Sequence, residues 1–287
     1  MSAAYNPATN LEIKVSDVEF RRASARTLMA RVYQPQGDGP FPALLDLHGG
    51  AWNDKDRTAN APMDEKLAAS GLLVVAVDLT LAPEAPYPAA VQDANYGIRW
   101  LKARAREWNG EPATVGALGS SSGGHVMELC AMRPHDPRYS AHSLPEAATV
   151  DATVAYVATR SPVSDPFARF KQAEKMGRKE MMQNSRIFFN PWETIHEGNP
   201  QEILDRGEPV TLPPLLIMQG ELDDNVLPSA QEKFAASYRA AGGHCELEIF
   251  AGCEHMWVAT PGPQADRAAE VVKDFISRQL SALRQAA

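Results

Sequence analysis

Hydrophobic positions along the chain follow two spacings in turn, and this predicts strands that alternate with helices. Short continuous apolar runs at residues 42–47 and 72–77 are typical of buried parallel strands. Between them, residues 62–70 have the composition of a helix, and Gly71 follows where a helix would end. Residues 89–108 carry apolar side chains at steps of three and four, which predicts a longer amphipathic helix. This order predicts an α/β fold: a mostly parallel central sheet with helices on both faces.

The same alternation continues to the end of the chain. Further strands are predicted at residues 11–20, 27–33, 115–118, 150–157, 215–218 and 245–250, and further helices at 124–132, 228–241 and 264–283. Only residues 159–210 show no clean period, although they contain many aromatic and methionine side chains. We expect a single domain, residues 1–287, in which segment 159–210 is an insertion that forms a lid or pocket wall over the sheet edge. An ordinary helical satellite is the alternative.

Composition excludes several classes of function. The chain has 287 residues and a formal net charge of −8, with no Lys/Arg block, so a nucleic-acid partner is not expected. Residues 1–10 lack the basic and apolar parts of a secretory signal, and no run of about 18 apolar residues predicts a membrane span. The three cysteines, Cys130, Cys245 and Cys253, are not spaced as metal ligands. This sparse set favours a cytoplasmic location over a disulfide framework.

A run of glycine and serine joins a predicted buried strand to a predicted helix. Residues 119–124 read Gly-Ser-Ser-Ser-Gly-Gly and contain the pattern G-x-S-x-G. In this context the pattern holds one serine at the apex of a sharp, strained turn, where small neighbours avoid a collision. We therefore predict that Ser121 is a nucleophile, flanked by Gly119 and Gly123. A flexible linker is the alternative, but linkers are not usually bracketed by a buried strand and an amphipathic helix.

A serine hydroxyl needs a base within hydrogen-bond distance, and the base needs an orienting acid. Of the seven histidines, His255 is the best candidate, because its loop follows the last predicted strand. The carboxyl ends of strands are where an open α/β sheet places its active site. Two adjacent carboxylates follow the strand at 215–218: we predict that Asp223 turns inward as the acid and that Asp224 stabilises the turn. The order serine, aspartate, histidine is that of the α/β-hydrolases.

Acyl transfer also requires hydrogen-bond donors for an oxyanion. Residues 48–52 read His-Gly-Gly-Ala-Trp directly after a buried strand, and the glycines let backbone N–H groups point into one cavity. The N–H of Ser122, at the start of a helix, adds a donor with a favourable helix dipole. His48 is expected to hydrogen-bond its own loop.

No metal or cofactor is expected. His135 and His142 lie in a proline-rich loop, and the chain has no H-E-x-x-H or C-x-x-C motif. The glycine-rich run lacks the lysine of a phosphate-binding P-loop. His125, one turn into the helix after Ser121, is expected to be a packed structural residue.

Over roughly residues 42–257 the chain resembles the hormone-sensitive-lipase-type branch of the α/β-hydrolases. The markers of that branch are H-G-G-G, Y-R-L-A-P-E followed by F-P-A, and G-D-S-A-G-G. Here they appear as HGGA at 48–51, LTLAPE at 79–84 with YPA at 87–89, and GSSSGG at 119–124. Three departures stand out: Ala51 replaces the last glycine, Ser120 replaces an aspartate, and Leu79-Thr80 replace Tyr-Arg.

The resemblance implies the α/β-hydrolase fold and assigns roles residue by residue. It implies a catalytic triad of Ser121, Asp223 and His255. It also implies an oxyanion hole made by the N–H groups of Gly50, Ala51 and Ser122.

Together these features favour a serine carboxylic-ester hydrolase that acts on small to medium apolar esters through an acyl-enzyme. The apolar preference depends on the aromatic and methionine side chains of segment 159–210, which are expected to form the pocket wall. An amide, carbamate or lactone hydrolase with the same triad is an alternative, because the chemistry differs mainly in the leaving group. A hydrolase scaffold that only binds a ligand is another. The sequence leaves a homodimer open.

Overall fold

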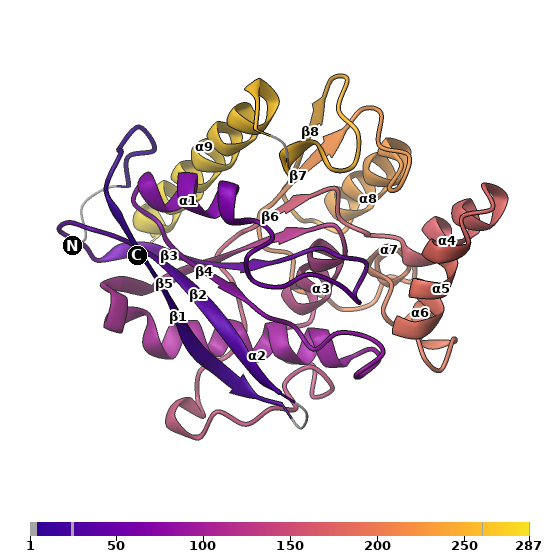
Figure 1. The fold of residues 1–287 in the computed structure, drawn as a ribbon, viewed down its shortest axis with the longest axis horizontal. Coiled ribbons are helices and arrows are strands. Elements are labelled where there is room, and N and C mark those ends of the chain that lie inside the picture. The colour runs from indigo at the N-terminus through magenta and orange to yellow at the C-terminus, as the bar shows by residue number, and fades with distance from the viewer. Residues whose placement is uncertain (1–4, 24–25, 260, 287) are drawn as a thin grey trace.

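One eight-stranded sheet organises the molecule, in the order β1-β2-β4-β3-β5-β6-β7-β8 (Figure 1). The computed structural model describes residues 5–23, 26–259 and 261–286. The strands are β1 Ile13–Arg22, β2 Thr27–Pro35, β3 Phe41–Leu47, β4 Leu73–Val77, β5 Gly110–Ser120, β6 Val157–Arg160, β7 Leu215–Gly220 and β8 Cys245–Phe250. β1 pairs antiparallel with β2, and β2 with β4, while β4, β3, β5, β6, β7 and β8 are parallel. This is the mostly parallel sheet that the sequence predicts.

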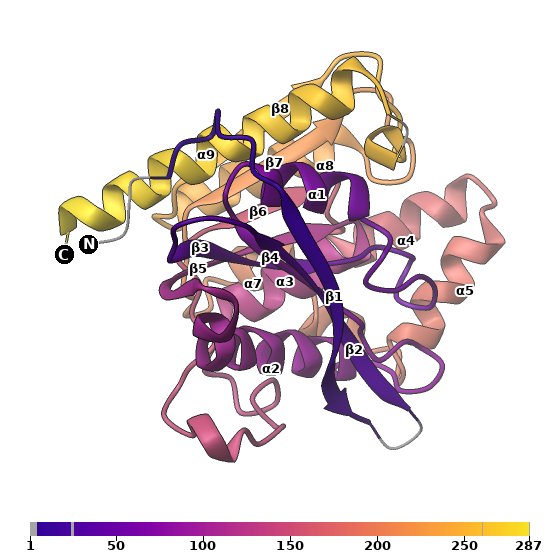
Figure 2. The same cartoon turned by 60° about the vertical axis from the view of Figure 1, so that its left-hand side comes forward.

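Helices cover both faces of the sheet. α1 (Ala61–Ala69) and α9 (Pro263–Ala286) pack on one face, and α2 (Ala89–Arg104), α3 (Ser122–Met132) and α8 (Pro228–Ala240) on the other (Figure 2). The side chains of β3 show the reason, because Leu44 joins the first apolar layer and Leu45 the second. Successive residues of a strand point to opposite faces, so an all-apolar strand needs cover on both. Short 3₁₀ helices lie at η1 Ala105–Trp108, η2 Pro145–Ala147 and η3 Trp257–Ala259.

One predicted strand is wrong. The sequence predicts a strand at 150–157, whereas β6 begins at Val157 and ends at Arg160. Before it, Asp151 Oδ1 accepts hydrogen bonds from the backbone N–H and the hydroxyl of Thr153, at 3.1 and 2.6 Å. Such local bonds satisfy the backbone in a turn instead of a ladder. Backbone hydrogen bonds to β5 start just after this turn, from Ala155 N to the carbonyl oxygen of Val115, and the register of β6 with β5 and β7 begins at Val157.

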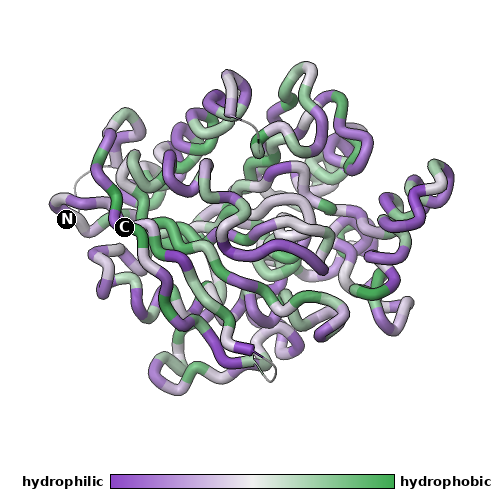
Figure 3. The backbone as a smooth tube through the Cα atoms, in the orientation of Figure 1, coloured by the Kyte–Doolittle hydropathy of each residue, from purple (hydrophilic) through white to green (hydrophobic). Residues whose placement is uncertain are grey.

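The segment without a clear period is helical. Between β6 and β7 the chain forms α4 (Pro166–Lys175), α5 (Lys179–Phe188), α6 (Thr194–Glu197) and α7 (Pro200–Asp205). α4, α5 and α6 lie together at one end of the molecule, beyond the sheet (Figure 1). The central strands are largely apolar, whereas α4 and α5, which lie beyond the sheet, are largely polar (Figure 3). The role of this segment as a lid stays a prediction.

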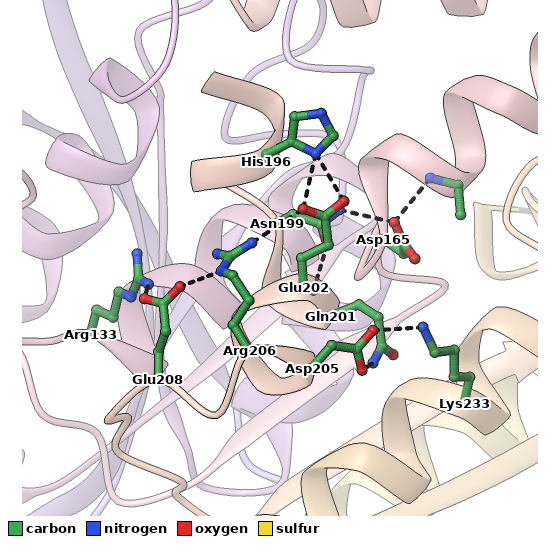
Figure 4. Close-up of polar contacts among 11 residues, drawn as sticks. Arg133, Asp165, His196, Asn199, Gln201, Glu202, Asp205, Arg206, Glu208 and Lys233 are labelled. Carbon is green, nitrogen blue, oxygen red and sulfur yellow. Dashed lines mark hydrogen bonds and ion pairs between the residues drawn. The ribbon is translucent and has the colours of Figure 1, made fainter. Parts of the chain in front are cut away.

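A polar network joins the two ends of this segment (Figure 4). The side chain of Asp165 caps α4 by accepting from Ala168 N at 2.9 Å. The side chain of Asn199 caps α7 by accepting from Glu202 N at 3.1 Å, and its amide donates to Asp165 at 3.0 Å. One amide therefore links the starts of two helices, each of which would otherwise leave N–H groups unpaired.

Three further observations concern the described residues. None of their helices is both long enough and apolar enough to cross a membrane. Their cysteines, Cys130, Cys245 and Cys253, are buried and free of disulfides. They contain no cluster of three or more His, Cys, Asp or Glu side chains arranged to hold a metal ion. Residues 1–4, part of the segment in which no secretory signal is predicted, lie outside this description.

Candidate active site

The predicted nucleophile lies at the turn between β5 and α3. Ser121 has φ 53° and ψ −116°, a strained conformation for a residue with a side chain. Its neighbours must be glycine because backbone atoms approach them closely. A Cβ atom on Gly119 would lie 2.8 Å from the carbonyl oxygen of Gly123, and one on Gly123 would lie 2.3 Å from that of His48. The flanking glycines thus have the steric role that the G-x-S-x-G pattern predicts.

Two hydrogen bonds connect Ser121, His255 and Asp223. Ser121 Oγ lies 2.9 Å from His255 Nε2, and His255 Nδ1 lies 2.8 Å from Asp223 Oδ2. Because the carboxylate can only accept, Nδ1 carries the proton and Nε2 is free to accept from the serine hydroxyl. These three residues come from the ends of β5, β7 and β8 and their loops, far apart in sequence. The arrangement can take a proton from Ser121 when the hydroxyl attacks an electrophile.

Asp223 is held as a buried anion. Its Oδ1 accepts from the N–H groups of Asn225 and Val226 at 3.0 and 2.8 Å, and Gln219 Nε2 donates to its Oδ2 at 3.0 Å. Burial acts to raise the pKa of this carboxyl, but the bonds from His255 and Val226 outweigh it and hold the pKa below its ordinary value. The neighbouring Asp224 is exposed and pairs with Arg178. The geometry therefore joins Asp223, and not Asp224, to His255.

The loop after β3 brings backbone N–H groups beside Ser121. A Cβ atom on Gly49 would lie 3.2 Å from Ser121 Cβ. Gly50 and Ala51 both have positive φ, 105° and 51°. Among the described residues, the N–H groups of Gly50, Ala51 and Ser122 have no hydrogen-bond acceptor. An oxygen that gains negative charge needs unpaired donors of this kind, and the role of these three N–H groups as an oxyanion hole stays a prediction.

Trp52 and His125 fix this loop to the segment between β6 and β7. The indole N–H of Trp52 donates to His125 Nδ1 at 3.1 Å, and His125 Nε2 lies 2.7 Å from the carbonyl oxygen of Gly198. The Trp52 ring stacks on Phe188, with ring centroids 4.8 Å apart. Burial lowers the pKa of His125 to about 4, so its ring is neutral at pH 7. His125 is the packed structural residue that the sequence predicts, and sequence reasoning missed its partners.

A cavity of about 290 Å³ opens beside Ser121. Segment 159–210 contributes four polar residues to its wall: Arg160, Arg169, Glu180 and Asn184. The apolar wall expected from the aromatic and methionine side chains of this segment is wrong, because none of them lines the cavity. They pack elsewhere, as Phe188 does on Trp52 and Phe170 on Trp192. Apolar side chains are most stable against one another, which leaves the polar side chains of these helices to face the cavity.

Sequence reasoning also missed Arg160. It is the last residue of β6, and its Nη1 donates to the carbonyl oxygen of His255 at 3.1 Å. Its own carbonyl oxygen accepts from Ser121 N at 2.8 Å. A correct placement of β6 would have put this side chain at the carboxyl edge of the sheet, where the site lies.

Comparisons with known proteins agree with this architecture. Esterase LipC of Mycobacterium tuberculosis is 26% identical over 83% of this chain and 59% of its own length. The probable carboxylic ester hydrolase LipM of the same organism is 26% identical over 68% of this chain and 44% of its own length. The chain thus spans about half the length of these curated relatives.

Solved structures and a family model extend the comparison. The carboxylesterase EstE1, cloned from a metagenomic library, superposes with a TM-score of 0.76 at 25% identity, covering 95% of this chain and 92% of EstE1. Carboxyl esterase 2 of the fungus Tuber melanosporum shares the fold, with a TM-score of 0.75 at 19% identity, over 95% of this chain and 89% of its own. A model of the BD-FAE family matches residues 31–238, most of the sheet and the helices that cover it. The chain therefore belongs to the BD-FAE family, in the hormone-sensitive-lipase-like branch of the α/β-hydrolases.

Proposed function

We propose that this protein is a serine hydrolase that cleaves carboxylic esters through an acyl-enzyme. The observation that carries the proposal is the continuous pair of hydrogen bonds from Ser121 through His255 to Asp223. The names of its relatives, esterase and carboxylic ester hydrolase, support the same reaction class.

In the proposed reaction, Ser121 Oγ attacks the ester carbonyl carbon and His255 Nε2 accepts the hydroxyl proton. The carbonyl oxygen becomes an oxyanion, which the N–H groups of Gly50, Ala51 and Ser122 stabilise. Removing one such donor typically costs about 3–4 kcal/mol in the transition state. The imidazolium then passes its proton to the alcohol oxygen, the C–O bond breaks, and the acyl group stays on Ser121.

Water completes the cycle by the same steps. His255 takes a proton from a water molecule that attacks the acyl carbon, and then returns it to Ser121 Oγ as the acid departs. Asp223 keeps the imidazole oriented and stabilises its charged form throughout. The helices α4 and α5, which supply Arg169, Glu180 and Asn184 to the cavity wall, are the part of the insertion that we propose as a cap over the substrate.

The test uses two variants of the full chain. Wild-type protein is expected to hydrolyse p-nitrophenyl acetate and butyrate, and Ser121→Ala to lose about four orders of magnitude or more in kcat. Ser120→Ala removes a neighbouring hydroxyl that lines the same cavity and serves as the matched control. Retained turnover in Ser121→Ala would refute the proposal.

Two further measurements address the alternatives. A fluorophosphonate probe should label Ser121, whereas a ligand-binding scaffold without catalysis would stay unlabelled. A matched amide or lactone cleaved far faster than the ester would replace ester hydrolysis as the main activity. We also propose a cytoplasmic location, which the three unpaired cysteines support.

A further inference from the structure

Two buried arginines line the cavity beside Ser121 without a carboxylate partner. Arg160, at the end of β6, is 7% exposed, and Arg169, on α4, is 8% exposed. No carboxylate oxygen of the described residues lies within 4 Å of either guanidinium. An arginine removed from water is stable only if other groups compensate its charge and its N–H donors. Both side chains therefore face the cavity as incompletely satisfied cations.

The hydrogen bonds of Arg160 leave most of its donors free. A guanidinium has five N–H donors in a fixed plane. In Arg160, Nη1 donates to the carbonyl oxygen of His255, and neither Nε nor Nη2 has an acceptor among the described residues. In Arg169, Nε and Nη2 both donate to Asn225 Oδ1, at 2.9 and 2.7 Å. Arg160 thus offers an adjacent pair of free donors, the geometry that binds a carboxylate with two parallel hydrogen bonds.

The charge of Arg160 persists despite burial. Burial lowers the pKa of Arg160 to about 10, so the side chain is protonated at neutral pH. Asp46 and Asp223 attract it from beyond ion-pair distance, but both are engaged elsewhere. Asn60 donates to both oxygens of Asp46, and His255 bonds Asp223. Among the residues that the structure describes, the remaining charged side chains of the cavity wall are Lys55, Arg169, Asp54 and Glu180, so this wall is not acidic as a whole.

Arg160 is also fixed next to the reacting atoms. Its carbonyl oxygen bonds the N–H of Ser121, and its guanidinium bonds the carbonyl of His255. Arg160 and Ser121 line the same cavity, so one ligand in that cavity can reach both residues.

From these contacts we propose that the ester cleaved at Ser121 carries a carboxylate on its acyl or its alcohol part, and that the guanidinium of Arg160 binds this carboxylate in the cavity. This inference rests on the proposed ester hydrolysis and names its substrate class. It adds a carboxylate to the ester, where the sequence alone favours an apolar ester.

The experiment compares matched esters that differ only in charge. With the anion on the alcohol part, 4-acetoxybenzoate is compared with the neutral 4-acetoxybenzamide. With the anion on the acyl part, monoethyl glutarate is compared with the ethyl ester of glutaramic acid. Wild-type protein is expected to prefer the anionic member of at least one pair by about tenfold or more in kcat/KM, the range for a hydrogen bond to a charged group. The pair that shows the preference identifies the half of the ester that carries the anion.

Variants then assign the preference to one side chain. In Arg160→Met the preference is expected to disappear, while the neutral ester reports whether the triad still works. Arg160→Lys keeps the charge without the planar pair of donors and should retain part of the preference. Arg31→Met removes a cation that pairs with Asp17 outside the cavity and should leave the preference unchanged.

The outcomes separate this inference from the proposed function. Neutral esters cleaved as fast as anionic ones by wild-type protein would overturn the carboxylate site and leave ester hydrolysis standing. A preference that survives in Arg160→Met and is lost in Arg169→Met would overturn the assignment to Arg160. No turnover of any ester, with no labelling of Ser121 by a fluorophosphonate, would overturn both proposals.

Discussion

His125 should make the stability of the fold depend on pH in a way that two substitutions can isolate. Its ring accepts from Trp52 at Nδ1, so Nε2 carries the only ring proton and donates to Gly198 O. A second proton would have to go on Nδ1, where the indole N–H already points. His125→Asn places an oxygen near the Nδ1 position and keeps the bond from Trp52. His125→Gln places an amide nitrogen near the Nε2 position and keeps the bond to Gly198.

The magnitude follows from the shifted titration of His125. Burial lowers its pKa from 6.5 to about 4 in the folded protein. Between these values the unfolded chain binds more protons than the folded one, so stability is full above pH 6.5 and is lost as the pH falls through 4. At pH 8 the ring is neutral in both states, so its titration does not change the free energy of unfolding. At pH 5 it lowers the free energy of unfolding by about 2 kcal/mol.

Each variant should lose a constant amount of unfolding free energy at every pH, because one hydrogen bond is broken. Each should also lose the destabilisation at low pH that comes from protonation of His125. His125→Asn leaves the carbonyl of Gly198 without a donor, and His125→Gln leaves the indole of Trp52 without an acceptor. Each buried polar group that is left without a hydrogen-bond partner lowers the free energy of unfolding by about 1–3 kcal/mol at any pH. The variants are therefore less stable than wild type at pH 8, and the difference should shrink by about 2 kcal/mol at pH 5 in both.

Urea denaturation at pH 8 and pH 5 measures this difference directly, since contributions from distant groups cancel between variant and wild type. The two variants control for each other, because they break opposite hydrogen bonds and share only the loss of an ionisable ring. A difference in unfolding free energy that stays constant between pH 8 and pH 5 would show that folding does not depress the titration of His125, and would refute the reasoning.

Two other predictions concern close backbone approach and a buried carboxylate. Gly123→Ala would place a Cβ atom 2.3 Å from the carbonyl oxygen of His48, so we expect turnover of p-nitrophenyl butyrate to fall by about 100-fold or more. Gly262→Ala is the control, because apart from its chain neighbours no described residue has an atom within 4 Å of the added carbon, and equal activity in both variants would contradict the prediction. Asp64 is fully buried with no partner for either oxygen among the described residues, and burial raises its pKa well above 3.8. A carboxyl whose pKa is raised by folding destabilises the folded protein as the pH rises above the unfolded pKa. The unfolding temperature of Asp64→Asn should therefore rise relative to that of wild type above about pH 4. A difference in unfolding temperature that does not change with pH would exclude this.

Much of the site could be predicted because its signals are local. The turn at Ser121 needs small neighbours on both sides, and the six consecutive residues 119–124 contain them. The alternation of apolar strands and amphipathic helices predicts the order of elements, and this order makes the loops that carry Asp223 and His255 converge at one edge. Even the choice between two adjacent aspartates followed from turn geometry. The structure brings Ser121, Asp223 and His255 into contact as the sequence predicts, and their catalytic roles stay proposals.

The wall of the cavity could not be predicted in the same way. The composition of segment 159–210 suggests an apolar wall, yet its aromatic side chains pack on Trp52 and on one another. Whether a side chain faces a core or a cavity depends on which surfaces the helices meet. The periodicity within α4 and α5 does not specify those surfaces.

The sequence by itself determined the α/β class, the turn at Ser121 and the three residues that meet there, because each depends on spacing within a short stretch of chain. Only the tertiary structure decided that β6 starts at Val157, that His125 joins Trp52 to Gly198, and that Arg160 faces the cavity. These features depend on pairing and packing between segments far apart in the chain. Such contacts depend on burial and hydrogen bonding throughout the fold, and a short stretch of sequence does not specify them.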